Sequence, residues 1–199
     1  MATIQYLLLE TLVIILTNHM KIYLKQLLDY LKVLLKINNK KMNPILKLNT
    51  IENTNEIVRL LKKSIIELCG PDYGNDSTIL NAWIENKTEE NLIKWIESKE
   101  TYSITALVEN TIVGFGLSNI TGEILLLYIL PEYKRKGIGE SIYLYIEELL
   151  LKNNVTKVIA YSTITAKPFY LKMGFSQFGS PIKVGKFDGE YPLEKSIVI

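Results

Sequence analysis

Over most of the chain, apolar residues follow two periods, one typical of helices and one typical of strands. Residues 56–68 carry apolar side chains at helical spacing and are followed by Gly70 and Pro71, which predicts a helix that ends there. Two shorter helices are predicted after Ser77 and after Thr88, because these hydroxyls can accept hydrogen bonds from the first N–H groups of a helix. The second quarter of the chain is therefore predicted to be helical.

Short runs of β-branched and apolar residues predict strands. The predicted strands cover residues 45–48, 103–108, 112–117, 124–130 and 155–161. Residues 109–111 suit the turn of a hairpin, and residues 118–122 suit the turn that follows it. A helical period between residues 138 and 149 places a longer helix between the last two of these strands. Residues 42–199 are therefore predicted to form one α+β domain with helices and strands in mixed order.

The first 41 residues differ from the rest and are predicted to form a helical extension. Apolar side chains line one seam of it, at Leu9, Val13, Leu16, Met20, Tyr23, Leu27, Tyr30 and Leu34. The apolar run 4–16 is shorter than the ~20 residues that span a bilayer, and no secretory signal is indicated. Packing on the same domain or on a second copy, as in a homodimer, is favoured for this seam. Contact with a membrane surface is one alternative, and disorder or an artefact of the sequence start is the other.

The composition narrows the possible function. The chain has 199 residues, 48% of them hydrophobic, which is enough for a substantial core. Its net charge of +2 gives no overall basic excess of the kind that indicates a nucleic-acid-binding protein. A single cysteine, Cys69, and a single histidine, His19, argue against an intramolecular disulfide and against the usual metal sites. We therefore expect a cytoplasmic protein that binds neither a metal nor nucleic acid.

A basic turn with two glycines, residues 131–139, joins the fourth predicted strand to the longer helix. Gly137 and Gly139 have no Cβ atom, so a ligand can approach the main chain closely. The helix that follows directs unpaired N–H groups and a partial positive charge toward the turn. The turn is therefore predicted to bind a phosphorylated cofactor, and the alternative is a solvated basic turn.

Two motifs in this order resemble those of the GNAT superfamily of N-acetyltransferases. The first, KRKGIG at residues 134–139, is similar to the superfamily's Arg or Gln, two residues, Gly, one residue, and Gly or Ala. Here Lys134 replaces the usual first residue. The second, AKPFYLKMGF at residues 166–175, is similar to the superfamily's Ala-x-x-Phe-Tyr-x-x-x-Gly-Phe signature. By these motifs residues 42–199 are identified as a GNAT N-acetyltransferase domain.

The resemblance implies a central twisted mixed sheet that is flanked by helices and splayed between its fourth and fifth strands. It also implies acetyl-CoA as the cofactor, with the pantetheine arm between the diverging strands, and no metal. Backbone groups of the fourth strand, together with amides and bases of the turn, are the implied contacts. These residues are Leu127, Tyr128, Ile129, Lys134, Arg135, Lys136, Gly137, Ile138, Gly139, Glu140 and Ser141.

Acetyl transfer to an amine needs a neutral nucleophile, and the departing thiolate must take up a proton. Tyr170 in the second motif resembles the superfamily's general acid, and core packing is the alternative. Glu123 begins the fourth strand at the spacing where the histone-acetylating branch of the superfamily carries its basic carboxylate. It is therefore a candidate base, acting directly or through water. A surface carboxylate, with a water chain as the base, is the alternative.

The segment after the first helix lies where this superfamily usually builds the acceptor side. Asp72, Tyr73 and Trp83 are therefore substrate-side candidates, and ordinary helix packing is the alternative. Cys69 ends the preceding helix with no activating base near it in sequence, so burial is favoured over a role as covalent acetyl carrier.

The predicted function is an acetyl-CoA-dependent N-acetyltransferase that acts by direct transfer in a ternary complex. The acceptor is expected to be a primary amine of a small molecule or a peptide. Two alternatives come from other classes of protein. One is a catalytically weak acyl-CoA-binding module that senses the cofactor. The other is a membrane-associated assembly protein that acts through residues 1–41.

Overall fold

The computed structural model describes residues 20, 21, 23–28, 41–48 and 51–198. The chain divides into two compact units, Met1–Lys41 and Met42–Ile199. In the first unit, residues 20, 21 and 23–28 are helical, and the rest of the predicted seam lies outside the described residues. None of the helices that are described has the length and apolar character needed to cross a membrane. The role of residues 1–41 stays a prediction.

Within the described residues, an eight-stranded mixed sheet forms the centre of the second unit. Its order is β1-β2-β3-β4-β5-β8-β6, with β7 paired to β8. The strands are β1 (Ile45–Leu48), β2 (Thr101–Val108), β3 (Thr111–Asn119), β4 (Glu123–Ile129), β5 (Lys157–Ser162), β6 (Ser176–Gln177), β7 (Ile182–Val184) and β8 (Phe187–Ser196). β4 and β5 pair in parallel, whereas the other described pairs are antiparallel. The predicted α+β class and its mixed sheet are confirmed.

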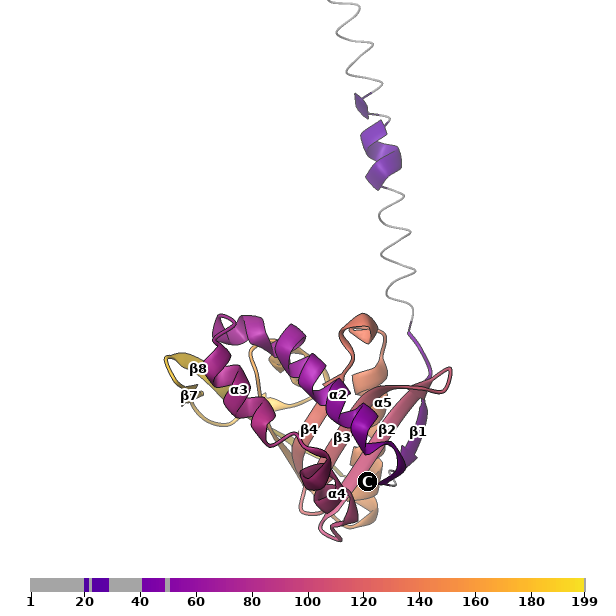
Figure 1. The fold of residues 1–199 in the computed structure, drawn as a ribbon, viewed down its shortest axis with the longest axis vertical. Coiled ribbons are helices and arrows are strands. Elements are labelled where there is room, and N and C mark those ends of the chain that lie inside the picture. The colour runs from indigo at the N-terminus through magenta and orange to yellow at the C-terminus, as the bar shows by residue number, and fades with distance from the viewer. Residues whose placement is uncertain (1–19, 22, 29–40, 49–50, 199) are drawn as a thin grey trace, which may run out of the picture. The chain divides into compact units, whose positions relative to one another are not determined.

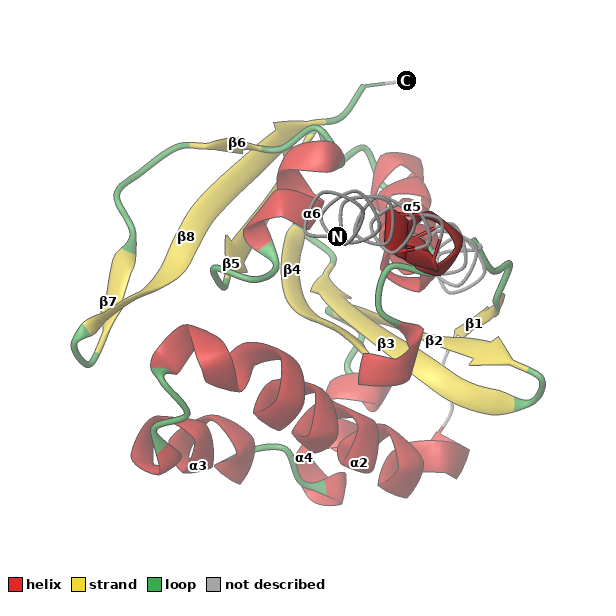
Figure 2. Ribbon diagram, turned by 90° about the horizontal axis from the view of Figure 1, so that it is seen from above, coloured by secondary structure: helices red, strands yellow, loops and turns green. Residues whose placement is uncertain are grey.

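Helices cover both faces of this sheet, as Figures 1 and 2 show. One face carries α2 (Thr54–Ser64), α3 (Ser77–Glu85) and α4 (Glu89–Glu97), and the other carries α5 (Ile138–Lys152) and α6 (Lys167–Lys172). The predicted helix 56–68 is present, but its last part is a π-helical segment, η2 (Ile65–Cys69), followed by a 3₁₀ turn, η3 (Gly70–Tyr73). π-Helical segments often lie at functional sites because they redirect the side chains that follow.

The predicted helix starts were right for one short helix and wrong by one residue for the other. The Thr88 hydroxyl accepts a hydrogen bond from the Asn91 N–H and caps α4, as expected. For α3, however, the cap is Asp76, whose carboxylate accepts from the N–H groups of Thr78 and Ile79, and not Ser77. Both residue types suit an N-cap, so the local sequence does not decide between neighbours.

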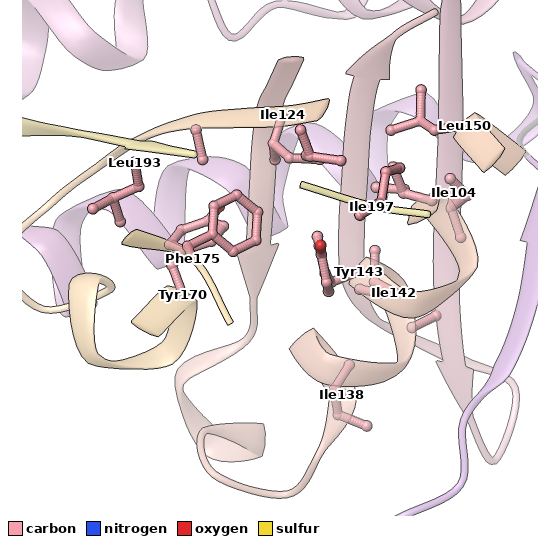
Figure 3. Packing of buried hydrophobic residues seen from close by; sticks show 14 of the residues in the cluster. Ile104, Ile124, Ile138, Ile142, Tyr143, Leu150, Tyr170, Phe175, Leu193 and Ile197 are labelled. Carbon is pink, nitrogen blue, oxygen red and sulfur yellow. The ribbon is translucent and has the colours of Figure 1, made fainter. Parts of the chain in front are cut away.

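The larger hydrophobic core lies between the sheet and the face that carries α5 and α6 (Figure 3). Two glycines of β3 allow α5 to lie directly on the sheet. A Cβ atom added at Gly114 would lie 2.7 Å from Ile142 Cδ1, and one added at Gly116 would lie 2.4 Å from Ile142 Cγ2. Both distances are shorter than carbon atoms can approach, so these glycines set how closely the helix packs. The position of the start of α5 follows from this packing.

The paired part of β4 and β5 is short. Glu123 lies opposite Ile159 and Ile124 lies opposite Ala160, and within the described residues the pairing ends there. β4 nevertheless continues to Ile129, with β3 as its partner on the other edge. The two strands therefore diverge after their first residues, and the predicted splay is confirmed. Backbone groups in the second half of β4 can serve a ligand in place of a neighbouring strand.

A bulge in β4 accompanies this divergence and was not predicted. The register with β3 shifts between Ile124, which pairs with Ser118, and Leu126, which pairs with Leu117. Residues two apart on a regular strand share a face. Here Ile124 packs in the core beneath α5, whereas Leu126 packs in the smaller core beneath α2. The bulge thus exchanges the two faces of β4 where the strands separate.

We expect Glu147→Gln to lower the free energy of unfolding by about 1–3 kcal/mol, because it weakens a charged link between α5 and β8. The Glu147 carboxylate accepts from the Tyr143 hydroxyl and pairs at 2.5 Å with Lys195 Nζ, and the side chains of the ion pair are 17% and 20% exposed. Glu148→Gln is the control, since its pair with Lys152 is exposed to solvent and should contribute little to stability. Urea unfolding of both variants tests this, and equal losses would contradict it.

Candidate active site

The basic turn after β4 forms a backbone cradle at the start of α5. The chain leaves β4 through a 3₁₀ turn, η4 (Pro131–Tyr133), and two residues then take left-handed conformations, Arg135 at φ 62° and Gly137 at φ 85°. An arginine in this region costs roughly 1–2 kcal/mol relative to an ordinary conformation. Strain of this kind is often found at ligand sites, where the surrounding structure maintains it.

The N–H groups at the start of α5 are available to an anion. The first hydrogen bond of the helix runs from the Ser141 N–H to the Gly137 carbonyl oxygen at 3.0 Å. The amides of Gly137, Ile138 and Gly139 come before this bond and have no acceptor within the helix. A Cβ atom added at Gly139 would lie 3.6 Å from the Phe169 ring, so the start of α5 lies against α6. The amides and the positive end of the helix dipole favour a phosphate group.

Two contacts outside the turn hold it in place. The Met42 N–H donates to the Lys136 carbonyl oxygen at 2.8 Å, which joins the start of the domain to the turn. Lys63 of α2 forms an ion pair with Glu132 in η4. The Lys134 and Arg135 side chains are exposed, whereas the Lys136 ammonium lies 5.1 Å from the centre of the Tyr133 ring. Lys134 and Arg135 can therefore reach a bound phosphate from solvent.

The predicted cofactor residues of β4 lie in the part of the strand that has left β5. Leu127 and Ile129 direct their side chains to the core beneath α5, and Tyr128 directs its side chain to the core beneath α2. Tyr128 also lies within electrostatic reach of Cys69, Tyr73, Tyr170 and Glu190. Side chains from both faces of the sheet therefore approach one another where β4 and β5 separate.

Tyr170 lies on α6 with 6% of its surface exposed. Its ring packs against Phe175 at 5.2 Å and against Phe169 at 5.1 Å, and Figure 3 shows the Tyr170 and Phe175 rings beside each other. Burial raises the pKa of its phenol well above the ordinary value. The phenol therefore stays protonated at neutral pH, as a general acid must, and it lies near Tyr128 at the splay.

Glu123 is the first residue of β4, at the opposite end of the strand from Ile129. It occupies the short stretch in which β4 still pairs with β5, opposite Ile159. Its N–H donates to the Asn119 side-chain oxygen at 2.7 Å, and its carboxylate accepts from Asn119 Nδ2 at 3.4 Å. The carboxylate is partly exposed, so water molecules can reach it. Its role as base stays a prediction.

The substrate-side candidates have structural partners. Asp72 accepts from the Thr165 N–H at 2.8 Å and from the Thr165 hydroxyl at 2.7 Å, so it anchors the loop that leads into α6. Tyr73 is 1% exposed, and its hydroxyl donates to the Gly189 carbonyl oxygen at 2.9 Å. Its ring packs edge-on against Trp83 at 5.5 Å. The structure therefore gives all three residues structural partners, and their contact with a substrate stays a prediction.

Cys69 is buried, and burial, followed by the charge of Asp72, raises the pKa of its thiol to about 12. A thiol with this pKa holds its proton at neutral pH and is a poor nucleophile. The structure therefore agrees with burial and disfavours a covalent acetyl carrier. Among the described side chains, no three of His, Cys, Asp or Glu lie close enough together to hold a metal ion.

The family follows from a comparison with models of known families. Residues 69–188 match the acetyltransferase (GNAT) domain. The chain belongs to the GNAT acetyltransferase family. This confirms the relationship expected from the two motifs, both of which lie inside the matched residues. A comparison with curated proteins found no match.

Solved structures show the same GNAT fold. PaiA N-acetyltransferase from Thermoplasma acidophilum, crystallised with coenzyme A, is 22% identical with a TM-score of 0.66, over 78% of this chain and 100% of that one. The ribosomal-protein-S18-alanine N-acetyltransferase from Escherichia coli is 11% identical with a TM-score of 0.58, over 79% and 96%. The aminoglycoside 6'-N-acetyltransferase from Enterococcus faecium is 16% identical with a TM-score of 0.53, over 78% and 98%. At these identities the likeness shows the fold.

Two residues of this GNAT site were not found from the sequence. Thr165 binds Asp72 across 93 positions of the chain, and only folding brings the two together. Glu190 on β8 lies within electrostatic reach of Tyr73 and Tyr128, but it is one charged residue in a strand of mixed composition. A single glutamate within a strand carries no local pattern, so the sequence held no signal for it.

Proposed function

We propose that this GNAT protein is an acetyl-CoA-dependent N-acetyltransferase that moves the acetyl group directly to a primary amine in a ternary complex. One observation carries the proposal. The cradle that begins α5, with Gly137 in its left-handed conformation, follows the stretch of β4 that has parted from β5. A phosphate-binding helix start beside an open strand edge suits a cofactor with a diphosphate at one end and an amide-containing arm.

In this proposal the amides from Arg135 to Ser141 hold the diphosphate, and Lys134, Arg135 and Lys136 add charge that salt will screen. The backbone groups of Leu127, Tyr128 and Ile129 bind the pantetheine amides and the thioester carbonyl as a neighbouring strand would. The thioester is thereby brought to the splay, where Tyr170 and Tyr128 approach each other. That the related PaiA enzyme was crystallised with coenzyme A supports this placement.

Three protons must move during the transfer: one leaves the acceptor ammonium, one reaches the departing sulfur, and one leaves the nitrogen of the new amide. The acceptor ammonium, with an ordinary pKa of ~10.4, first loses a proton to Glu123, directly or through water. The neutral nitrogen then attacks the carbonyl carbon, so that a C–N bond forms and the C–S bond breaks. Tyr170 donates its proton to the departing sulfur. The nitrogen, which still carries one proton too many for an amide, gives that proton back to Tyr170, directly or through water, so that a neutral amide, a free thiol and the phenol result. Because the thiolate forms in the same desolvated surroundings, its own basicity is raised along with the pKa of the phenol.

The acceptor is proposed to be an amine of a small molecule or of a peptide. The names of the related structures support both classes, since one is an aminoglycoside 6'-N-acetyltransferase and another a ribosomal-protein-S18-alanine N-acetyltransferase. At 11% and 16% identity neither points to the acceptor of this chain.

A panel of primary amines, incubated with acetyl-CoA and followed by detection of free thiol, tests the proposed activity. We expect thiol release to rise above the amine-free rate for at least one amine and to match the acetylated product one to one. A matched panel of alcohols of the same chain lengths is the control. Tight coenzyme A binding without thiol release from any amine would contradict the proposal and favour the cofactor-sensing module instead.

A further inference from the structure

Glu190 carries a carboxylate that the proposed reaction does not use. It lies on β8 opposite Ile182 of β7 and is half-buried. Throughout the part of the chain that the structure describes, no side chain donates a hydrogen bond to it or forms an ion pair with it. Burial of a carboxylate costs free energy unless a cation or a donor compensates it. This site therefore lacks a positive partner.

The direction of Glu190 follows from its neighbours on β8. Tyr191 packs on the α6 side of the sheet, where Lys167 Nζ lies 4.1 Å from the centre of its ring. Successive residues of a strand point to opposite faces, so Glu190 points to the face that carries α2 and η3. The hydrogen bond from the Tyr73 hydroxyl to the Gly189 carbonyl oxygen agrees with this, because it holds η3 against β8 one residue away.

This face of β8 borders the splay. Tyr191 pairs with Ser162, the last residue of β5, so Glu190 lies just beyond the end of β5. Across the gap, Tyr128 of β4 points to the same face and lies within electrostatic reach of Glu190. Burial raises the pKa of Glu190 above its ordinary value, and no cation among the described residues lowers it. An alkylammonium ion can be bound by a carboxylate through a charged hydrogen bond and by an aromatic ring through a cation–π interaction.

We propose that Glu190 binds the ammonium group of the acceptor opposite the Tyr128 ring, and so selects alkyl amines that are protonated before they react. The inference rests on the proposed acetyl transfer and adds a specificity-determining residue on the acceptor side. Glu190 and Glu123 then have separate tasks. Glu190 draws the cation to the splay, whereas Glu123 takes up the proton that the amine loses. Tyr73, held to Gly189, is the buried support that keeps this part of β8 in position.

The test compares two probes of equal length, n-butylammonium and n-butanol, titrated into the full chain bound to coenzyme A and followed by NMR chemical shifts. We expect the wild type to bind the cation at least about tenfold more tightly than the alcohol, as a charged hydrogen bond provides. Glu190→Gln should abolish this preference. Glu194→Gln is the matched control, because it removes the same charge from the same strand and face, where the carboxylate already pairs with Lys157 at 3.0 Å.

Kinetics provide a second readout. For an alkylamine acceptor, Glu190→Gln should raise KM about tenfold or more and change kcat at saturating amine less than about threefold. Its melting temperature should not fall, because the change removes a partly desolvated charge for which the described residues provide no cation. A residue with a purely structural role would lower the melting temperature and leave KM unchanged.

Two outcomes would overturn the inference. One is an unchanged preference for the cation in Glu190→Gln, and the other is an equal loss of preference in Glu194→Gln, which would indicate general electrostatics. These results differ from a failure of the proposed function. If no amine is acetylated while the cation preference still depends on Glu190, the acetyl transfer is wrong and the ammonium site stands. If amines are acetylated with the same KM in Glu190→Gln, only the ammonium site is wrong.

Discussion

Gly137→Glu is expected to weaken coenzyme A binding by about 100-fold or more while the domain stays folded. The new carboxylate would lie among the amides that are proposed to hold the diphosphate. Repulsion between like charges about 4 Å apart amounts to some 4 kcal/mol near a protein surface, before screening by salt. Because Gly137 has φ 85°, any side chain there also costs about 1–2 kcal/mol of strain, which is small against the 5–15 kcal/mol stability of a typical domain.

Isothermal titration calorimetry with coenzyme A measures this effect, and two variants separate its causes. Gly137→Gln introduces the same size and strain without the charge, so it should bind between the wild type and Gly137→Glu. Gly139→Ala places a methyl group 3.6 Å from the Phe169 ring, an ordinary contact, and should bind within about threefold of the wild type. Unchanged affinity in Gly137→Glu would show that this helix start does not hold the diphosphate.

Tyr170→Phe is expected to lower kcat by about 100-fold or more without changing coenzyme A affinity. General-acid catalysis typically contributes two to four orders of magnitude, and phenylalanine keeps the ring that packs on Phe175 and Phe169. The variant should therefore fold and bind the cofactor, but leave the sulfur without its proton donor. Steady-state turnover with a good amine acceptor and the binding titration measure the two quantities. A normal kcat would mean that Tyr170 serves only packing.

The pH dependence offers a check on the same residue. A free tyrosine loses its proton near pH 10, and burial raises the pKa of Tyr170 above this value. Since a raised pKa extends the protonated form to higher pH, Tyr170 should cause no loss of kcat up to about pH 9. Tyr161→Phe, on the exposed side of β5, is the control and should leave kcat and its pH profile unchanged. An alkaline decline in the wild type that Tyr170→Phe removes would contradict the expected pKa.

The sequence was most informative where function depends on backbone and local spacing. Gly137 and the bases before it predicted an anion site, because a glycine that precedes an amphipathic helix has its effect within a few residues. The hairpin between β2 and β3 was also predicted, although its turn consists of two residues. Glu109 and Asn110 both take positive φ, whereas Thr111 already belongs to β3. The prediction placed Thr111 in the turn, although it begins β3. Asn suits such a turn, whereas Thr occurs both in turns and in strands.

The sequence was least informative about contacts between distant segments. Asp72 is a substrate-side candidate from its place in the chain, but the sequence did not show that its two oxygens accept from Thr165, on the loop into α6. The bulge at Leu125 also escaped prediction, because an unbroken apolar run shows no period from which a shift could be read. Each of these features depends on which elements become neighbours.

The sequence by itself determined the order of helices and strands, the basic glycine turn and the two motifs that indicate the GNAT family. These depend on interactions within a few residues, which spacing along the chain records. Only the tertiary structure decided where β4 and β5 part, how Asp72 supports the loop into α6, and that Glu190 lies within electrostatic reach of Tyr128. Side chains that are far apart in the chain come together only when the sheet and the two helical layers pack, and no local pattern encodes that proximity.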